Sequence, residues 1–175
     1  MSNVLIGIIG VILFIGLALA SASILGEDFM TASATSRAAA VSSQMQQLSS
    51  GINTLSFRRS ITLPANIGEG FAQQLVNYGA IKSIPRNPVN NNAYFPVDRN
   101  TGTSGGPIGA IYTIIGTDSY ARDVCFALEE QSGNPNPEAA ISTPVAFATK
   151  LAAQPRLGCL MNSSMGNAYT AYIAV

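Results

Sequence analysis

An uncharged, largely apolar run at residues 4–26 constrains the fold of this chain more than any other feature. It reads VLIGIIGVILFIGLALASASILG, which is 23 residues. As an α-helix it would extend about 35 Å, enough to cross a hydrocarbon core of about 30 Å. A helix that is apolar on every side must be buried on every side, and the rest of a chain this short cannot do so. Lipid or neighbouring copies of the chain are therefore required.

Three roles fit such a run. It is a secretory signal, a retained membrane anchor, or a helix that resides in the membrane first and in an assembly later. Residues 18–20 and 20–22 both fit the small-x-small cleavage pattern of a signal, but no Lys or Arg precedes the run and its apolar part is long. On the run alone, an anchor is favoured over an assembly helix.

Glycine placement also bears on the role of the run. Gly7, Gly10 and Gly16 interrupt it, and Gly16 with Ala20 forms a small-xxx-small pair that lets helices approach closely. Because glycine costs about 1 kcal/mol in a helix interior, we expect Gly7, Gly10 and Gly16 to permit local loss of regular helix once the segment leaves lipid. Glycine is also commoner in membrane helices in general, which is the alternative explanation.

Residues 27–57 continue the helix with a different pattern. The stretch contains no proline, and its apolar residues recur at the spacing of one helix face. This stalk–head seam comprises Ala34, Ala38, Val41, Met45, Leu48, Ile52 and Leu55. Gly26 and Gly51 are weak points only. We therefore predict one helix of about 55 residues and roughly 80 Å, apolar over residues 1–26 and amphipathic over 27–57.

Residues 58–175 are predicted to form a globular α/β head. The predicted elements are a short helix over 68–78 ended by Gly79, a loop over 86–109, a strand over 110–115, a helix capped by Thr117 or Asp118, a loop over 134–144, an ambiguous segment over 145–154, and a strand over 168–175. The fold class is α+β: a long N-terminal helical stalk packed on a C-terminal head that contains an antiparallel sheet.

Composition excludes several classes of function. Nine basic and nine acidic residues make up 10% of the chain, with zero net charge, so no footprint for nucleic acid is present. Histidine is absent, which rules out a Ser-His-Asp triad and the usual zinc sites. Cys125 and Cys159 are either two buried thiols or, in an exported head, a disulfide that would contribute roughly 3–4 kcal/mol. We expect the disulfide.

In order and spacing, these segments resemble the type IV pilins, specifically the type IVb class. The matching parts are MSNVLIGIIGVILFIG at the N-terminus, LVNYGAIKSIPRNPV after the long helix, IYTIIGTDSYARDVCFALEE as a strand and a Cys-bearing helix, Cys159, and AYTAYIAV as a late strand. The resemblance covers nearly the whole chain. It departs from the family at Leu5, where most pilins carry a glutamate. No leader precedes the run, so Met1 is expected to be the processed N-terminus.

The resemblance implies a structural subunit and no enzyme or cofactor. Subunits would wait in the inner membrane and then form an extracellular filament on a bacterial cell surface. Their partners would be further copies of the chain, inner-membrane lipid, the pilus assembly machinery and the prepilin peptidase. The expected filament-core residues are Leu5, Ile6, Ile8, Ile9, Ile12, Leu13, Phe14 and Leu17. Two alternatives are a pseudopilin of a secretion machine and a membrane-anchored extracytoplasmic binding domain.

Weaker patterns have ordinary explanations. Lys82 and Lys150 lie among many serines, but no nucleophile–base spacing stands out. Glu129, Glu130 and Asp98 offer carboxylates for calcium without an EF-hand spacing.

Two further patterns concern the surface. Asn162-Ser163-Ser164 fits a glycosylation sequon, a match that is frequent by chance. Arg58-Arg59 offers a pairing with Glu27 or Asp28 of a neighbouring subunit, the alternative being a solvated helix end.

Overall fold

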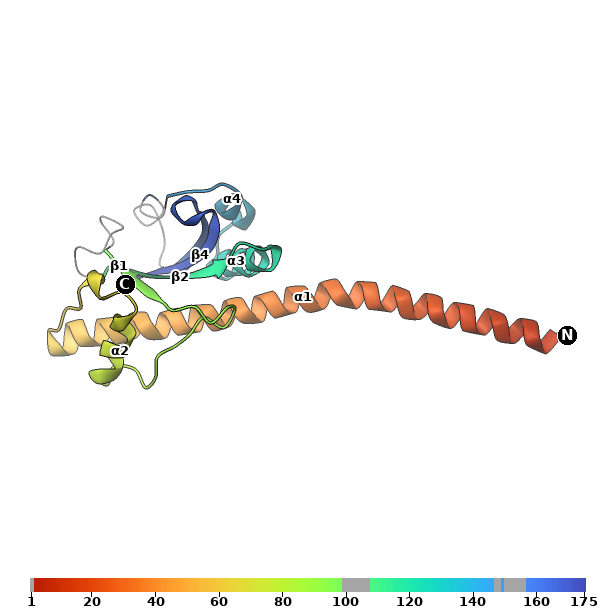
Figure 1. Cartoon of the computed structure of the whole chain (residues 1–175), viewed down its shortest axis with the longest axis horizontal. Helices are drawn as coiled ribbons and strands as arrows, with labels where there is room; N and C mark the ends of the chain where they lie inside the picture. The colour runs from red at the N-terminus through yellow and green to blue at the C-terminus, as the bar shows by residue number, and fades with distance from the viewer. Residues whose placement is uncertain (1, 99–107, 147–148, 150–156) are drawn as a thin grey trace. The chain divides into compact units, whose positions relative to one another are not determined.

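The chain has an α+β fold in which one long helix precedes a four-stranded antiparallel sheet (Figure 1). The computed structural model describes residues 2–98, 108–146, 149 and 157–175, except for the side chains of residues 2–7, 18–27 and 66. By internal contacts the chain forms two compact units, Met1–Ser33 and Ala34–Val175. We call these the N-terminal unit and the C-terminal unit and describe each by itself.

Helix α1 (Ser2–Arg59) runs for 58 residues and passes through Gly26 and Gly51 without a break. The prediction of a single long helix is confirmed. Its last turn contains Arg58 and Arg59, whose positive charge suits a helix C-terminus. Ser60 then adopts a left-handed backbone with φ +52°, and the Ile61 N–H donates back to the Leu55 carbonyl at 3.2 Å. These features end the helix two residues beyond the predicted limit.

The sheet has the strand order β1-β2-β4-β3, with every neighbouring pair antiparallel. Its centre consists of β2 (Ala110–Gly116) and β4 (Ala168–Ala174), in the register Ile111↔Ile173. Both strands were predicted and are confirmed. The edges, β1 (Phe95–Val97) and β3 (Leu157–Asn162), were not predicted.

Further helical segments lie in the described part of the C-terminal unit. They are α2 (Gly70–Asn77), α3 (Ser119–Gln131) and α4 (Pro137–Ser142), with short 3-10 turns η1 (Ala65–Ile67) and η2 (Ser163–Met165). Of the two predicted caps of α3, Thr117 and Asp118, the structure has Asp118, whose carboxylate accepts from the Ala121 N–H at 2.7 Å. Gly79, at φ +68°, follows α2 as predicted.

Two loop predictions were wrong in part. The predicted loop over 86–109 contains β1, and the predicted loop over 134–144 contains α4. Helix α2 also begins at Gly70, two residues later than predicted. Most of the ambiguous segment over 145–154 lies outside the described residues, although Val145 forms an isolated bridge with Asn162.

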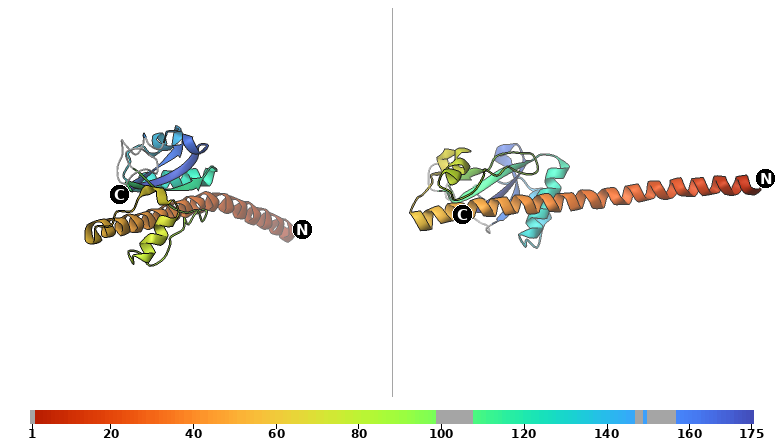
Figure 2. Two further views of the ribbon diagram at one scale, coloured as in Figure 1. Left: turned by 60° about the vertical axis from the view of Figure 1, so that its left-hand side comes forward. Right: turned by 90° about the horizontal axis from the view of Figure 1, so that it is seen from below.

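The core of the C-terminal unit lies between the second half of α1, the sheet and α3. Within this unit, α2 lies on the other side of α1 from the strands (Figures 1 and 2). The core includes Ile111, Ala171 and Ile173 from one face of the sheet, together with Val124 and Leu128 of α3. A smaller cluster, Val97, Ala110, Leu160 and Tyr172, occupies the opposite face. The sheet is therefore buried on both faces at its centre.

Candidate functional site

The N-terminal unit exposes a continuous apolar surface over residues 8–17 of α1. Its eight large apolar side chains are 50–74% exposed, with Phe14 the most exposed. We call this set the apolar surface; its members are Ile8, Ile9, Val11, Ile12, Leu13, Phe14, Ile15 and Leu17. The side chains of the other two predicted packing residues, Leu5 and Ile6, lie outside the described part of the chain.

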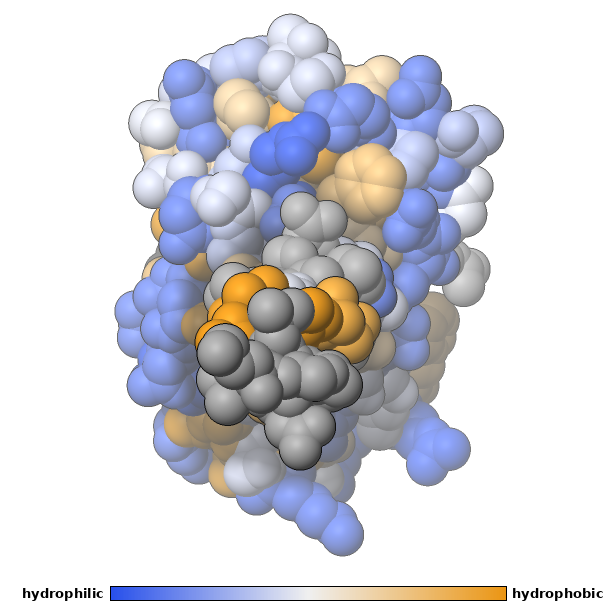
Figure 3. All heavy atoms as spheres, turned by 90° about the vertical axis from the view of Figure 1, so that its right-hand side faces the viewer, coloured by the Kyte–Doolittle hydropathy of each residue, from blue (hydrophilic) through white to orange (hydrophobic). Residues whose placement is uncertain are grey.

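The apolar surface surrounds the helix, because eight of ten consecutive residues contribute to it. Figure 3 shows hydrophobic side chains at the surface of this segment. Exposed apolar patches on this scale mark sites of contact with protein or membrane. Because the contacts are non-directional, any apolar surroundings satisfy them. All eight side chains are apolar, so this set can make apolar contacts and offers no acid, base or nucleophile.

The glycines within this segment leave room for close approach. A Cβ built on Gly10 or Gly16 would meet nothing within 4 Å, so neither glycine is required by packing within the chain. The side-chain surroundings of Gly7 lie outside the described residues. Helix α1 is regular through all three positions in the single chain. Local loss of helix on leaving lipid stays a prediction.

A membrane span over residues 4–26 also stays a prediction. Judged on the described residues alone, none of the helices has the length and apolar character that crossing a membrane requires.

The seam residues of α1 lie inside the C-terminal unit. Val41, Met45 and Leu48 have no exposed surface, and Ile52 and Leu55 are at most 6% exposed. They pack in the same core as the sheet and α3. The periodicity of residues 34–55 thus reflects burial within one chain. The two halves of α1 differ in that the seam is covered by the chain itself and the apolar surface is not.

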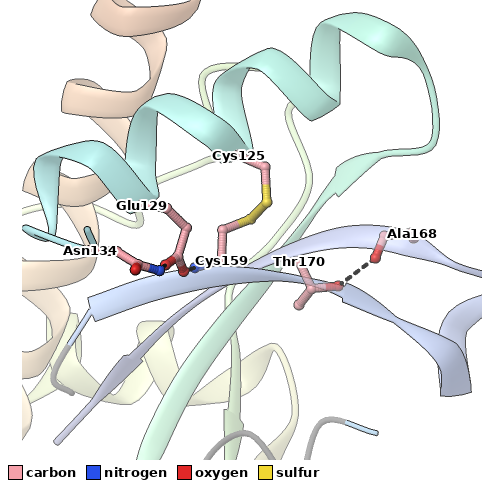
Figure 4. Close-up of a disulfide and its surroundings, with 6 residues drawn as sticks. All are labelled: Cys125, Glu129, Asn134, Cys159, Ala168 and Thr170. Atoms are coloured by element: carbon pink, nitrogen blue, oxygen red, sulfur yellow. Dashed lines mark hydrogen bonds between the residues drawn. A yellow bond between two sulfur atoms is a disulfide. The ribbon is translucent and has the colours of Figure 1, made fainter. Parts of the chain in front are cut away.

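The disulfide between Cys125 and Cys159 is present. It joins α3 to the edge strand β3, with a Cα–Cα distance of 5.4 Å and a sequence separation of 34 (Figure 4). Both cysteines are fully buried. The bond fixes the outermost strand to a helix that already packs in the core, which stabilises the sheet edge.

Glu129 reinforces the same junction. Its carboxylate accepts from the Cys159 N–H at 2.6 Å and from the side-chain amide of Asn134 (Figure 4). The Tyr172 ring lies close by, and its pKa is raised by burial first and by the Glu129 charge second. Glu129 thus has a structural role, and its hydrogen bonds account for its burial.

Glu129 and Glu130, two of the carboxylates that the sequence offers for calcium, have different surroundings. Glu129 is committed to Cys159 and Asn134, while Glu130 is exposed on α3. Over the described ranges, no group of three or more potential ligands is close enough to hold a metal ion. Lys150 lies outside the described residues, and Lys82 is exposed.

Asn162, the asparagine of the sequon, is fully buried. Its side-chain oxygen accepts from the Ser164 N–H at 3.0 Å, and its amide nitrogen, the atom that would carry a glycan, has no described partner. The folded chain cannot present this nitrogen to a glycosyltransferase.

Sequence reasoning missed an asparagine cluster at the edge of β2. The side-chain amides of Asn87, Asn90 and Asn92 donate to the Ile114 carbonyl at 3.1, 2.9 and 3.1 Å, and Asn90 also donates to Ile115 at 2.7 Å. These bonds occupy the edge of β2 beyond the end of β1, which would otherwise be open to pairing. The run PVNNN was visible in the sequence, but its target strand was not.

The comparisons with known proteins leave the family open. No protein-family model and no curated protein matches the chain.

Proposed function

We propose that the chain is a type IVb pilin-like structural subunit that polymerises through its N-terminal apolar helix into an extracellular filament. The observation that supports this best is the apolar surface, whose side chains are 50–74% exposed in the single chain. The order of a long helix, a sheet, and a disulfide from α3 to β3 is consistent with the sequence resemblance.

The free energy of assembly would come from burial of the apolar surface. Each large apolar side chain contributes about 1.5–3 kcal/mol when it is fully removed from water. Eight such side chains per copy give a large driving force, even after the cost of association is subtracted. When the contact joins unlike surfaces and its repetition does not form a closed ring, the product is a helical polymer.

Before assembly, the same segment would reside in the inner membrane, with the C-terminal unit on the outer side. The buried disulfide is consistent with an oxidising compartment. By resemblance, the prepilin peptidase and the pilus assembly machinery would process and extract the subunit. Low charge suits subunits that crowd together in a filament.

Electron microscopy of sheared appendages tests the proposal. Cells that produce the full-length chain are sheared, and the released material is imaged with an antibody against the chain; cells lacking the chain are the control. Long labelled filaments are expected. Labelled material that stays short and attached to the cell would favour a pseudopilin. A chain found only in the membrane fraction would favour an anchored binding domain and would overturn the proposal.

A further inference from the structure

Helix α1 carries two exposed aromatic patches next to opposite charges. The acidic patch is Asp28, Phe29 and Met30; Phe29 is 72% and Met30 50% exposed. The basic patch is Phe57 and Arg58, at the C-terminal end of the helix, and Phe57 is 84% exposed. Aromatic residues, methionine and arginine are enriched in protein–protein interfaces, and charged groups lie mainly at the interface rim.

The part of the chain that the structure describes offers no ion pair to either Asp28 or Arg58. Among the described residues, Arg122 and Glu138 form an ion pair at 2.5 Å, whereas Asp28 and Arg58 contact no oppositely charged group. Arg59 donates to the Tyr78 carbonyl at 2.7 Å. A basic residue in the last turn is favourable for any helix, so Arg58 alone would need no partner. That effect does not explain an aromatic ring as exposed as Phe57.

The two patches are complementary in kind. Glu27 and Asp28 are the only charged side chains in residues 1–33, so the N-terminal unit is purely acidic and its charge is concentrated at one place. Arginine and a carboxylate form strong charge-assisted hydrogen bonds, and two phenyl rings attract each other beyond their burial. This complementarity of charge and ring chemistry makes a second copy of the chain a partner that fits each patch.

We propose that the basic patch of one copy docks on the acidic patch of another copy. Arg58 pairs with Asp28, and Phe57 packs against Phe29 and Met30. This inference rests on the proposed function. It adds a directional contact to the non-directional packing of the apolar surface. Because the two surfaces are unlike, each copy keeps one free patch for a further copy, and the contact can repeat along an open polymer. The pairing of specific charges also fixes the register between neighbouring subunits.

A charge-reversal cycle in the full-length chain tests the pairing. Asp28→Arg and Arg58→Asp are made singly and together, and the fraction of the chain in the sheared filaments is measured against its total amount in the cell. Each single variant should lower this fraction about tenfold, and the double variant should restore it to within about twofold of wild type. Arg86→Asp, a reversal at an exposed arginine outside both patches, is the matched control and should assemble normally.

A cross-link in intact filaments provides a second, direct measurement. Cells that make Asp28→Cys and Arg58→Cys chains together should give a disulfide-linked dimer under mild oxidation, since the contact brings the two new cysteines close together. The two native cysteines are paired with each other and buried, so they do not compete for this bond. Cells with either variant alone should give none.

The failure of the docking contact is distinguishable from the failure of the proposed function. If the wild-type chain forms no filaments, the proposed function fails. If wild-type filaments form but single reversals assemble normally, or the double variant shows no recovery and no dimer appears, only the docking contact is overturned.

Discussion

At the scale of single residues, Gly158 in β3 has the closest surroundings of the glycines that the structure describes. A Cβ there would lie 2.7 Å from Tyr172 Oη and 2.8 Å from Glu129 Oε1. Tyr172 is buried and Glu129 is held by two hydrogen bonds, so neither can move aside easily. We expect Gly158→Ala to lower the free energy of unfolding by about 1–3 kcal/mol. Thermal unfolding of the full-length chain in mild detergent measures this. Gly70→Ala is the control, because its Cβ would meet nothing within 4 Å; equal losses in both variants would contradict the argument.

Tyr94 makes stability depend on pH in the alkaline range. Its hydroxyl donates to Gln44 Oε1 at 2.7 Å, and burial raises the pKa of the phenol. A raised pKa means that the folded chain keeps the proton after the unfolded chain has begun to lose it. The resulting stability is complete below a pH of about 10, the ordinary pKa of tyrosine, and is lost as the pH rises further. The same sign applies to Tyr172.

Tyr94→Phe should therefore weaken this alkaline loss. At neutral pH it should cost about 1 kcal/mol, because Gln44 loses a hydrogen bond. Unfolding midpoints of the wild type and the variant, followed from pH 7 to about 11, measure both effects. A variant whose midpoint falls as steeply as that of the wild type would show that Tyr94 does not contribute to the slope.

At the scale of secondary-structure elements, Gly51 marks the contact between α1 and the segment around α2. A Cβ at Gly51 would lie 3.1 Å from Ile81 Cγ2 and 3.6 Å from Leu75 Cδ1. We expect Gly51→Leu to destabilise the fold by about 1–3 kcal/mol, since a larger side chain would push α2 away from α1. Ser50→Leu introduces the same side chain one residue earlier on an exposed face and should change stability by less than about 0.5 kcal/mol. Denaturant unfolding of both variants compares them; a larger effect for Ser50→Leu would be evidence against this packing.

The elements that were predictable from the sequence are those with a strong local pattern. Helix α1 has a long seam, α3 has its Asp118 cap, and β2 and β4 are rich in β-branched and aromatic residues. Strand β1 has three residues with Pro96 in the middle, so its pairing depends on β2 and not on its own propensity.

The remaining omissions have different causes. Helix α4 has only six residues, although its Asn136 cap and the proline after it are start signals that were available. Strand β3 does not alternate, because its residues are mostly buried on both faces. The apolar surface was predictable from the uncharged run of residues 4–26. The close packing at Gly51 and the hydrogen bonds of the asparagine cluster were not predictable, because the residues they contact lie far along the chain.

At the scale of the whole molecule, the proposed function assigns different tasks to the buried and the exposed apolar residues of α1. The buried residues stabilise the fold, and the exposed residues drive polymerisation. Met45 is fully buried in the C-terminal unit, so Met45→Ala should lower the unfolding free energy of that unit by about 2–5 kcal/mol. Phe14 is 74% exposed in the single chain, so Phe14→Ala should leave that free energy unchanged. If Phe14 is buried between subunits, removing its ring costs the polymer about 1.5–3 kcal/mol of burial free energy per subunit. This loss should raise the critical concentration for polymerisation by about 10–100-fold. Unfolding in detergent and sedimentation of polymers after detergent removal measure the two properties separately. A Phe14→Ala chain that polymerises like the wild type would show that the apolar surface is covered by something other than further copies of this chain.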